Sequence, residues 1–140
     1  MITLNHIGVA VESPEARTKL EKLFSLLNVK KTHEEKVPDQ GVKVHFLPLT
    51  ADLGPPQIEL LEVDDPEGTV AKFIATRGAG IHHLSFLLKT GDLEPLCQKL
   101  VAEGIRLTYT SPKMGAHHMR INFIHPQSAG GILIELMEKA

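Results

Sequence analysis

The segment Ile58-Glu-Leu-Leu-Glu62 returns 76 positions later as Ile134-Glu-Leu-Met-Glu138. Other segments recur in the same order at an offset of 77: His6-Ile7 as His83-Leu84, and Lys43-Val-His-Phe46 as Arg120-Ile-Asn-Phe123. Segments that match in a constant order at a nearly constant spacing indicate an internal duplication. We therefore predict two copies of one unit, a first repeat at residues 1–64 and a second repeat at residues 80–140, joined by a linker at residues 65–79.

Each repeat has the pattern of one strand, one helix and three further strands. Ser13 followed by Pro14 is typical of a helix start, and Thr90 or Asp92 can cap the second helix. Helical spacing predicts two buried stripes: Ala16, Leu20, Leu23, Phe24 and Leu27, then Leu93, Leu96, Leu100 and Val101. The expected strands are residues 3–11, 30–36, 41–48 and 57–63, and residues 81–88, 106–109, 118–125 and 131–137.

The expected fold class is α+β, with two tandem βαβββ modules. The linker is expected to carry a short helix with Val70, Phe73 and Ile74 on its buried face. Apolar residues make up 42% of the 140 residues and charged residues 23%, which suits a single domain over residues 1–140.

Composition also excludes several classes of protein. A net charge of -2 argues against nucleic acid as a partner, and a single cysteine, Cys97, excludes an internal disulfide and an all-cysteine zinc site. The apolar runs are far shorter than the roughly 20 residues that cross a bilayer, and the first residues do not resemble a secretory signal. We therefore expect a cytoplasmic protein with no membrane partner.

Alternation of side chains along the strands selects four candidate ligands. Positions of one parity in each strand are apolar and suit packing against the helix. The opposite face carries matching residues of the two repeats in mid-strand: His6, Glu59, His83 and Glu135. A carboxylate between apolar neighbours is costly unless it is paired or bound to a cation. Imidazole and carboxylate together suit Co²⁺, Mn²⁺, Ni²⁺, Fe²⁺ or Zn²⁺, and four protein ligands leave room for a substrate on an octahedral ion.

The chain resembles the vicinal oxygen chelate superfamily, and within it the methylmalonyl-CoA epimerase family, in six segments: Asn5–Val11, Val37–Val42, Ile58–Glu62, Val70–Ile74, Gly80–Leu84 and Arg120–Leu136. This resemblance implies paired βαβββ modules whose mixed sheet curves into a cup around a metal site, with a divalent metal held by the same four residues. It implies an isomerase that interconverts (R)- and (S)-methylmalonyl-CoA by proton removal and return at C2, through an enolate that a cation stabilises. It also implies an acyl-CoA substrate and a homodimer.

One departure from the family leaves the acid–base groups open. The resemblance places an acid–base glutamate two residues after the Gly41-Val42 pair, where this chain has Val44. The remaining candidates are Glu135, Glu59, and the pair His117 and His118.

Other functions of the same fold are alternatives. Lactoylglutathione lyase uses similar ligands and the same proton-transfer logic, but residues 37–42 and the C-terminal segment favour the epimerase. A ring-cleaving dioxygenase needs two histidines and one carboxylate, so a fourth ligand at Glu59 counts against it. A non-catalytic module that binds a small molecule, or confers resistance to it, is a further alternative.

Overall fold

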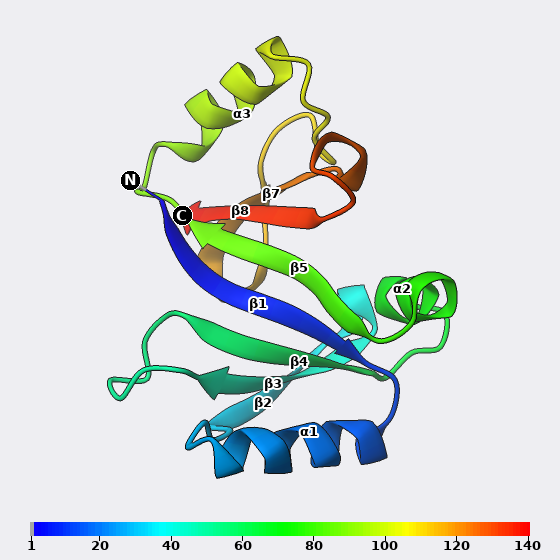
Figure 1. The fold of residues 1–140 in the computed structure, drawn as a ribbon. Helices are drawn as coiled ribbons and strands as arrows, with labels where there is room; N and C mark the ends of the chain where they lie inside the picture. Colours follow the sequence, from blue (N-terminus) through cyan, green and yellow to red (C-terminus); the bar gives the residue numbers. More distant parts are fainter. Residues whose placement is uncertain (1) are drawn as a thin grey trace. The chain divides into compact units, whose positions relative to one another are not determined.

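Both repeats have the predicted βαβββ order of elements (Figure 1). The structure, a computed structural model, describes residues 2–140, with only the backbone of Ala116. Contacts divide the chain into two compact units: one contains residues 6–82, and the other combines residues 83–140 with the residues before His6. Among the described residues, no helix has the length and apolar character needed to span a membrane.

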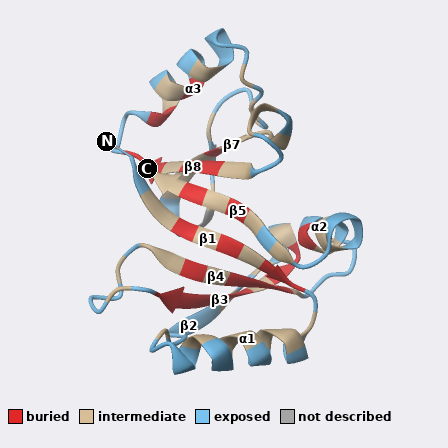
Figure 2. Ribbon diagram, in the orientation of Figure 1, coloured by how far each residue is buried: buried red, intermediate tan, exposed pale blue. Residues whose placement is uncertain are grey.

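The first repeat forms four strands in the order β2-β3-β4-β1. Its elements are β1 (Thr3–Val11), α1 (Pro14–Leu26), β2 (His33–Val37), β3 (Val42–Pro48) and β4 (Gln57–Val63). Strands β1 and β4 are parallel, and the other neighbours are antiparallel. Figure 2 shows that β3 and β4 carry much of the buried surface of this repeat.

The second repeat has the same topology, in the order β5-β8-β7-β6. Its elements are β5 (Gly80–Leu87), α3 (Leu93–Ala102), β6 (Lys113–Met114), β7 (Met119–Ile124) and β8 (Leu133–Lys139). Strands β5 and β8 are parallel, whereas β8, β7 and β6 are antiparallel neighbours. Helix α2 (Thr69–Arg77) lies between the repeats, as predicted, and its Val70 is fully buried in the core beside β3 and β4.

The two helices of the repeats begin in different ways. Ser13 caps α1 as predicted, because its hydroxyl accepts a hydrogen bond from the Ala16 N–H at 3.2 Å. Asp92 occupies the cap position of α3 but makes no such bond. A distant carboxylate replaces it: Glu138 in β8 accepts bonds from the N–H groups of Gly91 and Leu93 at 2.8 and 2.9 Å.

The buried stripes of both helices are narrower than the sequence predicted. Residues four apart on α1 pack against the strands: Ala16, Leu20 and Phe24. Leu23 and Leu27 are 53% and 63% exposed, because they lie to one side of that line. On α3, Val101 is also exposed, and Cys97 is buried in the stripe instead.

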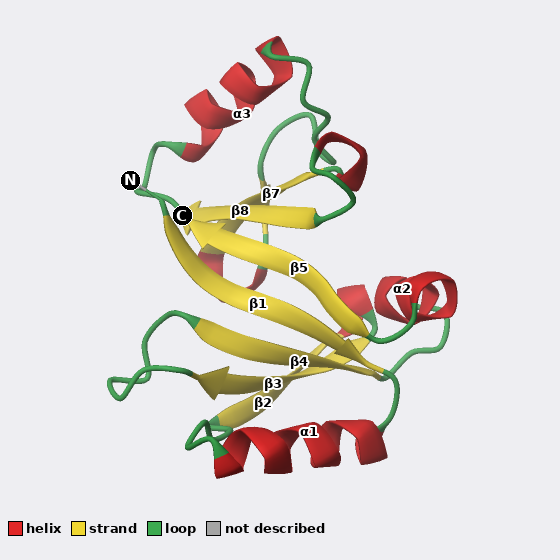
Figure 3. Ribbon diagram, viewed as in Figure 1, coloured by secondary structure: helices red, strands yellow, loops and turns green. Residues whose placement is uncertain are grey.

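The strand predicted at residues 106–109 is wrong. The chain that follows α3 is mostly loop (Figure 3). Residues 106–109 make only an isolated bridge between Leu107 and Ile124, and the short strand β6 comes after them. Side chains take up the backbone groups that a strand would pair. The N–H of Arg106 bonds to the Ser128 hydroxyl at 2.9 Å, and the N–H of Tyr109 bonds to the Asn122 amide oxygen at 3.1 Å.

Candidate metal centre

The two predicted ligands of the first repeat contact each other. His6 lies in β1 and Glu59 in β4, and the His6 Nδ1 is 2.7 Å from the Glu59 Oε2. Both side chains are nearly buried, with exposed fractions of 9% and 13%. In the register of the parallel pair, the residue opposite Glu59 is Gly8, which has no side chain. The first repeat therefore offers one imidazole and one carboxylate together on the face away from α1.

The second repeat buries its two predicted ligands as well. His83 in β5 and Glu135 in β8 are 5% and 8% exposed. The residue opposite Glu135 in the parallel pair is Ser85, which is fully buried. Its hydroxyl donates a hydrogen bond to the Glu135 Oε1 at 2.6 Å. Sequence reasoning missed this serine, although a hydroxyl at the position that matches Gly8 is a visible difference between the repeats.

The donor set fits a divalent transition ion. His6, His83 and Glu135 are all buried, and their imidazole and carboxylate groups could hold a metal ion. Glu59, the fourth predicted ligand, contacts His6. Neutral imidazoles and carboxylates are the ligands that Co²⁺, Mn²⁺, Ni²⁺, Fe²⁺ and Zn²⁺ share. Burial of carboxylates in mid-strand is also easier to account for with a cation than without one.

Each candidate carboxylate has a phenylalanine directly across the antiparallel pair. Phe46 is the register partner of Glu59, and Phe123 is that of Glu135. An aromatic ring from the next segment covers each phenylalanine: His33 stacks on Phe46 at 4.2 Å, and a tyrosine meets Phe123 edge-on at 6.1 Å. These apolar walls lower the local dielectric around the carboxylates and so strengthen their interaction with a cation.

A further carboxylate shares the ligand-bearing face of the first repeat. Glu35 in β2 is the register partner of Val44 in β3, so the two side chains project from the same face. Val44 belongs to the core cluster on that face, and Glu35 is half-buried beside it. The chain therefore places a carboxylate one strand away from the position where the resemblance implied one. Alternation in residues 33–37 was the signal that could have found it.

The histidine pair lies at a turn before β7. His117 and His118 are exposed, and both have left-handed backbone angles, with φ of 56° and 57°. Non-glycine residues rarely adopt this conformation, so the turn stores strain. Nothing in this geometry assigns either imidazole a proton-transfer role, and that role stays a prediction.

His45 faces the opposite side of the first repeat, because it follows Val44 in β3 and successive side chains alternate across a strand. The imidazole is fully buried beneath α1, where its Nδ1 lies 3.3 Å from the carboxylates of Glu21 and Glu34. Burial lowers the pKa of His45, and the nearby cations Lys31 and Arg17 lower it further. This histidine is a neutral part of an ion-pair network and not a candidate ligand.

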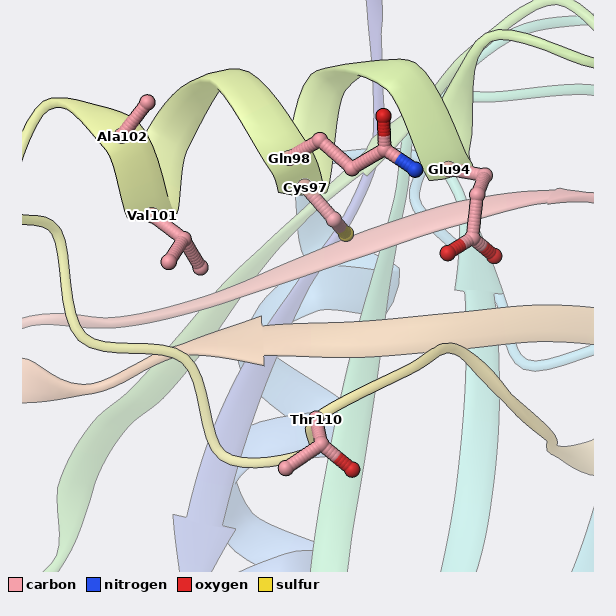
Figure 4. A pocket seen from close by; sticks show the side chains of 6 residues that line it. All are labelled: Glu94, Cys97, Gln98, Val101, Ala102 and Thr110. Carbon is pink, nitrogen blue, oxygen red and sulfur yellow. The ribbon is translucent and has the colours of Figure 1, made fainter.

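A hollow of about 330 Å³ lies on the helix side of the second repeat (Figure 4). Residues of α3 line it together with Thr110 from the facing loop: Glu94, Cys97, Gln98, Val101 and Ala102. Burial raises the pKa of the Cys97 thiol, so the thiolate that would act as a nucleophile is disfavoured. Glu135 projects from the other face of the strands, so the hollow is separate from the candidate metal centre.

Known proteins are similar to this chain over nearly its whole length. Methylmalonyl-CoA epimerase from Mycobacterium tuberculosis is 36% identical, and its crystal structure has a TM-score of 0.80 with this chain, covering 98% of this chain and 87% of that one. An ethylmalonyl-CoA/methylmalonyl-CoA epimerase of Cereibacter sphaeroides is 30% identical over 95% of both chains. A methylmalonyl-CoA epimerase solved with methylmalonyl-CoA and NH4+ is 30% identical, with a TM-score of 0.79 over 98% of this chain and 94% of that one.

A family model accounts for most of the chain. The model described as the glyoxalase/bleomycin resistance protein/dioxygenase superfamily matches residues 5–123. This match and the solved structures confirm the resemblance inferred from the sequence and the α+β fold class of two βαβββ modules. The chain belongs to the glyoxalase/bleomycin resistance protein/dioxygenase superfamily.

Proposed function

We propose that this chain is a metal-dependent epimerase that interconverts (R)- and (S)-methylmalonyl-CoA by removing and returning the proton at C2. The observation that carries the proposal is the set of buried imidazole and carboxylate side chains at matching positions of the two repeats. Similarity to epimerases over nearly the whole chain supports this substrate more than the glutathione adduct of the lyase.

In this proposal the metal ligands are His6, Glu59, His83 and Glu135. A divalent ion bound there would supply Lewis-acid stabilisation for negative charge that develops on a carbonyl oxygen. The imidazoles would bind as neutral groups, and the two carboxylates would offset the charge of the ion. Co²⁺, Mn²⁺, Ni²⁺, Fe²⁺ and Zn²⁺ all suit these donors.

The side chains of the protein must move the proton. A C–H group beside a thioester is a weak acid, so one group removes the proton and another delivers one to the opposite face of the carbon. Glu59 and Glu135 are the proposed groups at the centre, with His117 and His118 as alternatives. Glu35 adds a carboxylate on the same strand face as Glu59.

Several finer features belong to the same proposal. The similarity to a structure that contains methylmalonyl-CoA supports an acyl-CoA as substrate. We propose that residues 1–140 act as one functional domain, because the candidate ligands come from both repeats. A homodimer and a cytoplasmic location stay predictions from the sequence.

The proposal is tested by solvent exchange at C2. Protein loaded with Co²⁺ is incubated with methylmalonyl-CoA in D2O, and deuterium at C2 is followed by NMR. We expect exchange that depends on protein and metal, and a strong loss in a His83→Ala variant prepared in the same way. Absence of deuterium at C2 in the loaded protein contradicts the proposal, and turnover of the methylglyoxal–glutathione adduct would instead support the lyase.

A further inference from the structure

The two candidate carboxylates occupy matching positions but have different partners across the parallel strand pair. Glu59 lies opposite Gly8, and Glu135 lies opposite Ser85. Because β1–β4 and β5–β8 have the same register, the only change at this position is the side chain that faces the carboxylate. A glycine offers no group to bind it, whereas a serine offers a hydroxyl donor.

The serine makes a short bond in a fully buried place. Its Oγ is 2.6 Å from the Glu135 Oε1, and the Ser85 residue is 0% exposed. That separation falls in the range of charge-assisted O–H···O⁻ bonds, which are about twice as strong as neutral ones. The Met137 sulfur lies 3.1 Å from the same hydroxyl, but a thioether is a weak acceptor, so the single hydroxyl proton goes to the carboxylate.

We propose that Ser85 is a positioning residue, which holds the Oε1 of Glu135 and leaves its Oε2 directed to the metal. The inference rests on the proposed metal site. A group that hydrogen-bonds to a metal ligand fixes the orientation of that ligand before the ion binds. The ligand side chain then loses less conformational entropy when it binds the ion. The serine therefore makes Glu135 the carboxylate that a strand neighbour holds in place, whereas Glu59 contacts the imidazole of another candidate ligand, His6.

The first test measures metal affinity rather than turnover. Apo protein is titrated with Co²⁺ by calorimetry and by the visible absorption of the bound ion. We expect Ser85→Ala to weaken Co²⁺ binding about 10–100-fold, the usual cost of losing an outer partner of a ligand, and to change the Co²⁺ spectrum. Ser128→Ala is the matched control, because it removes another serine hydroxyl of the same unit, one that accepts a bond from the Arg106 N–H. The control should bind Co²⁺ like the wild type.

The second test separates positioning from a general structural effect. If Ser85 acts through Glu135, its effect disappears once that carboxylate is gone. In a Glu135→Ala background, Ser85→Ala should change Co²⁺ affinity by less than about 2-fold. An equal loss in both backgrounds, or unchanged affinity and spectrum in the single variant, overturns the inference.

The outcomes also distinguish this inference from the proposed function. Wild-type protein that binds Co²⁺ but does not exchange the C2 proton contradicts the epimerase proposal and leaves the role of Ser85 supported or refuted by affinity alone. If the wild-type protein binds no Co²⁺, that result contradicts both the proposed metal site and the inference about Ser85. Thermal unfolding of each apo variant confirms that the affinities compare folded proteins.

Discussion

The two repeats have the same strand topology, but the buried polar groups beneath their helices have different hydrogen-bond partners. Glu62 in β4 and Glu138 in β8 are equivalent glutamates, and both face the helix side. Glu62 bonds to a side chain of its helix, with the Arg17 Nε at 2.9 Å. Glu138 bonds to the backbone at the start of its helix and to Arg120 at 3.0 Å. A duplicated position therefore keeps its carboxylate while the partner changes.

The neighbouring strand shows the same kind of difference. His45 in β3 and Asn122 in β7 are equivalent, and both are fully buried. Asn122 is satisfied by neutral backbone groups, because its amide bonds to the N–H and the carbonyl of Tyr109 at 3.1 Å. His45 lies among charged side chains. The first repeat thus uses a network of charges where the second uses amide and backbone bonds.

The largest effect we expect separates the two candidate ligands. Glu135→Gln should lower the rate of C2 exchange about 10²–10⁴-fold, because it removes a charge from a fixed ligand and from a proposed acid–base group. Glu59→Gln should lower the rate less, by about 10–10²-fold, because the amide oxygen can still bind the ion and the other proposed acid–base group, Glu135, stays intact. Exchange rates in D2O at saturating metal concentration measure the effects of both substitutions. Equal rate losses in the two variants would contradict the predicted difference between the two candidate ligands.

The next effect concerns the equivalent glutamates beneath the helices. Glu138→Ala should lower the free energy of unfolding by about 2–4 kcal/mol, because it leaves two backbone donors of the α3 start without their buried acceptor, while Arg120 keeps its ion pair with Glu94. Glu62→Ala is the matched change in the first repeat. It should cost less, since Arg17 keeps the ion pair that it already makes with Glu21 at 3.1 Å. Urea denaturation of the two variants measures the difference in their free energies of unfolding. A larger loss for Glu62→Ala would contradict the prediction that the glutamate of the second repeat contributes more.

A smaller effect depends on pH. The pKa of His45 in the folded protein lies below its usual value of 6.5, so below that pH the unfolded chain binds a proton that the folded chain does not. The free energy of unfolding should therefore fall as pH drops through 6.5, by up to about 1.4 kcal/mol per pH unit from this group. His45→Asn, which copies the second repeat, should remove that contribution.

The measurement for His45 is the difference between wild-type and His45→Asn stability at pH 8 and at pH 5.5. Other titrating groups contribute equally to both proteins, so only the change in the difference is diagnostic. The charges that face the imidazole are those of Glu21, Glu34, Glu62, Lys31 and Arg17. A wild-type advantage that grows as the pH falls would show that these carboxylates keep the imidazole protonated. A difference that does not vary with pH would show that folding leaves the pKa of His45 unchanged.

The smallest effect lies on the surface of α1, which exposes Leu23 and Leu26, whereas every leucine of α3 is at least partly buried. Leu26 is 74% exposed, so Leu26→Gln should change the free energy of unfolding by less than about 0.5 kcal/mol. Sedimentation of the same variant tests the homodimer. A shift to monomer would show that α1 is covered in the dimer, and the repeats would then also differ in assembly.

Much of the fold could be read from the sequence because apolar alternation and caps determine it locally. Residues 3–11 and 57–63 were predicted as strands with the same bounds as β1 and β4. Parity in these strands also selected His6 and Glu59, because it depends only on which residues the helix covers. The segment at residues 106–109 was misassigned, since Asn122 and other side chains compete for its backbone.

The partners of the candidate ligands were less accessible to sequence reasoning. The pairing of Glu35 with Val44 and of Ser85 with Glu135 depends on register, which no local pattern of this chain specifies. The cap of α3 was missed for a similar reason, because Glu138 reaches it from a strand 45 residues away in sequence. Contacts between residues that are far apart in sequence are thus the features that the sequence did not predict and the structure shows.

The way the chain divides has a consequence for its synthesis. The unit of residues 6–82 is continuous and can assemble as soon as it leaves the ribosome. The other unit needs residues from both ends of the chain: Thr3, for example, donates a hydrogen bond to the Leu87 carbonyl at 3.4 Å. The start of β1 must therefore wait until β5 is translated, and the strands of this unit are complete only after β8 has been made.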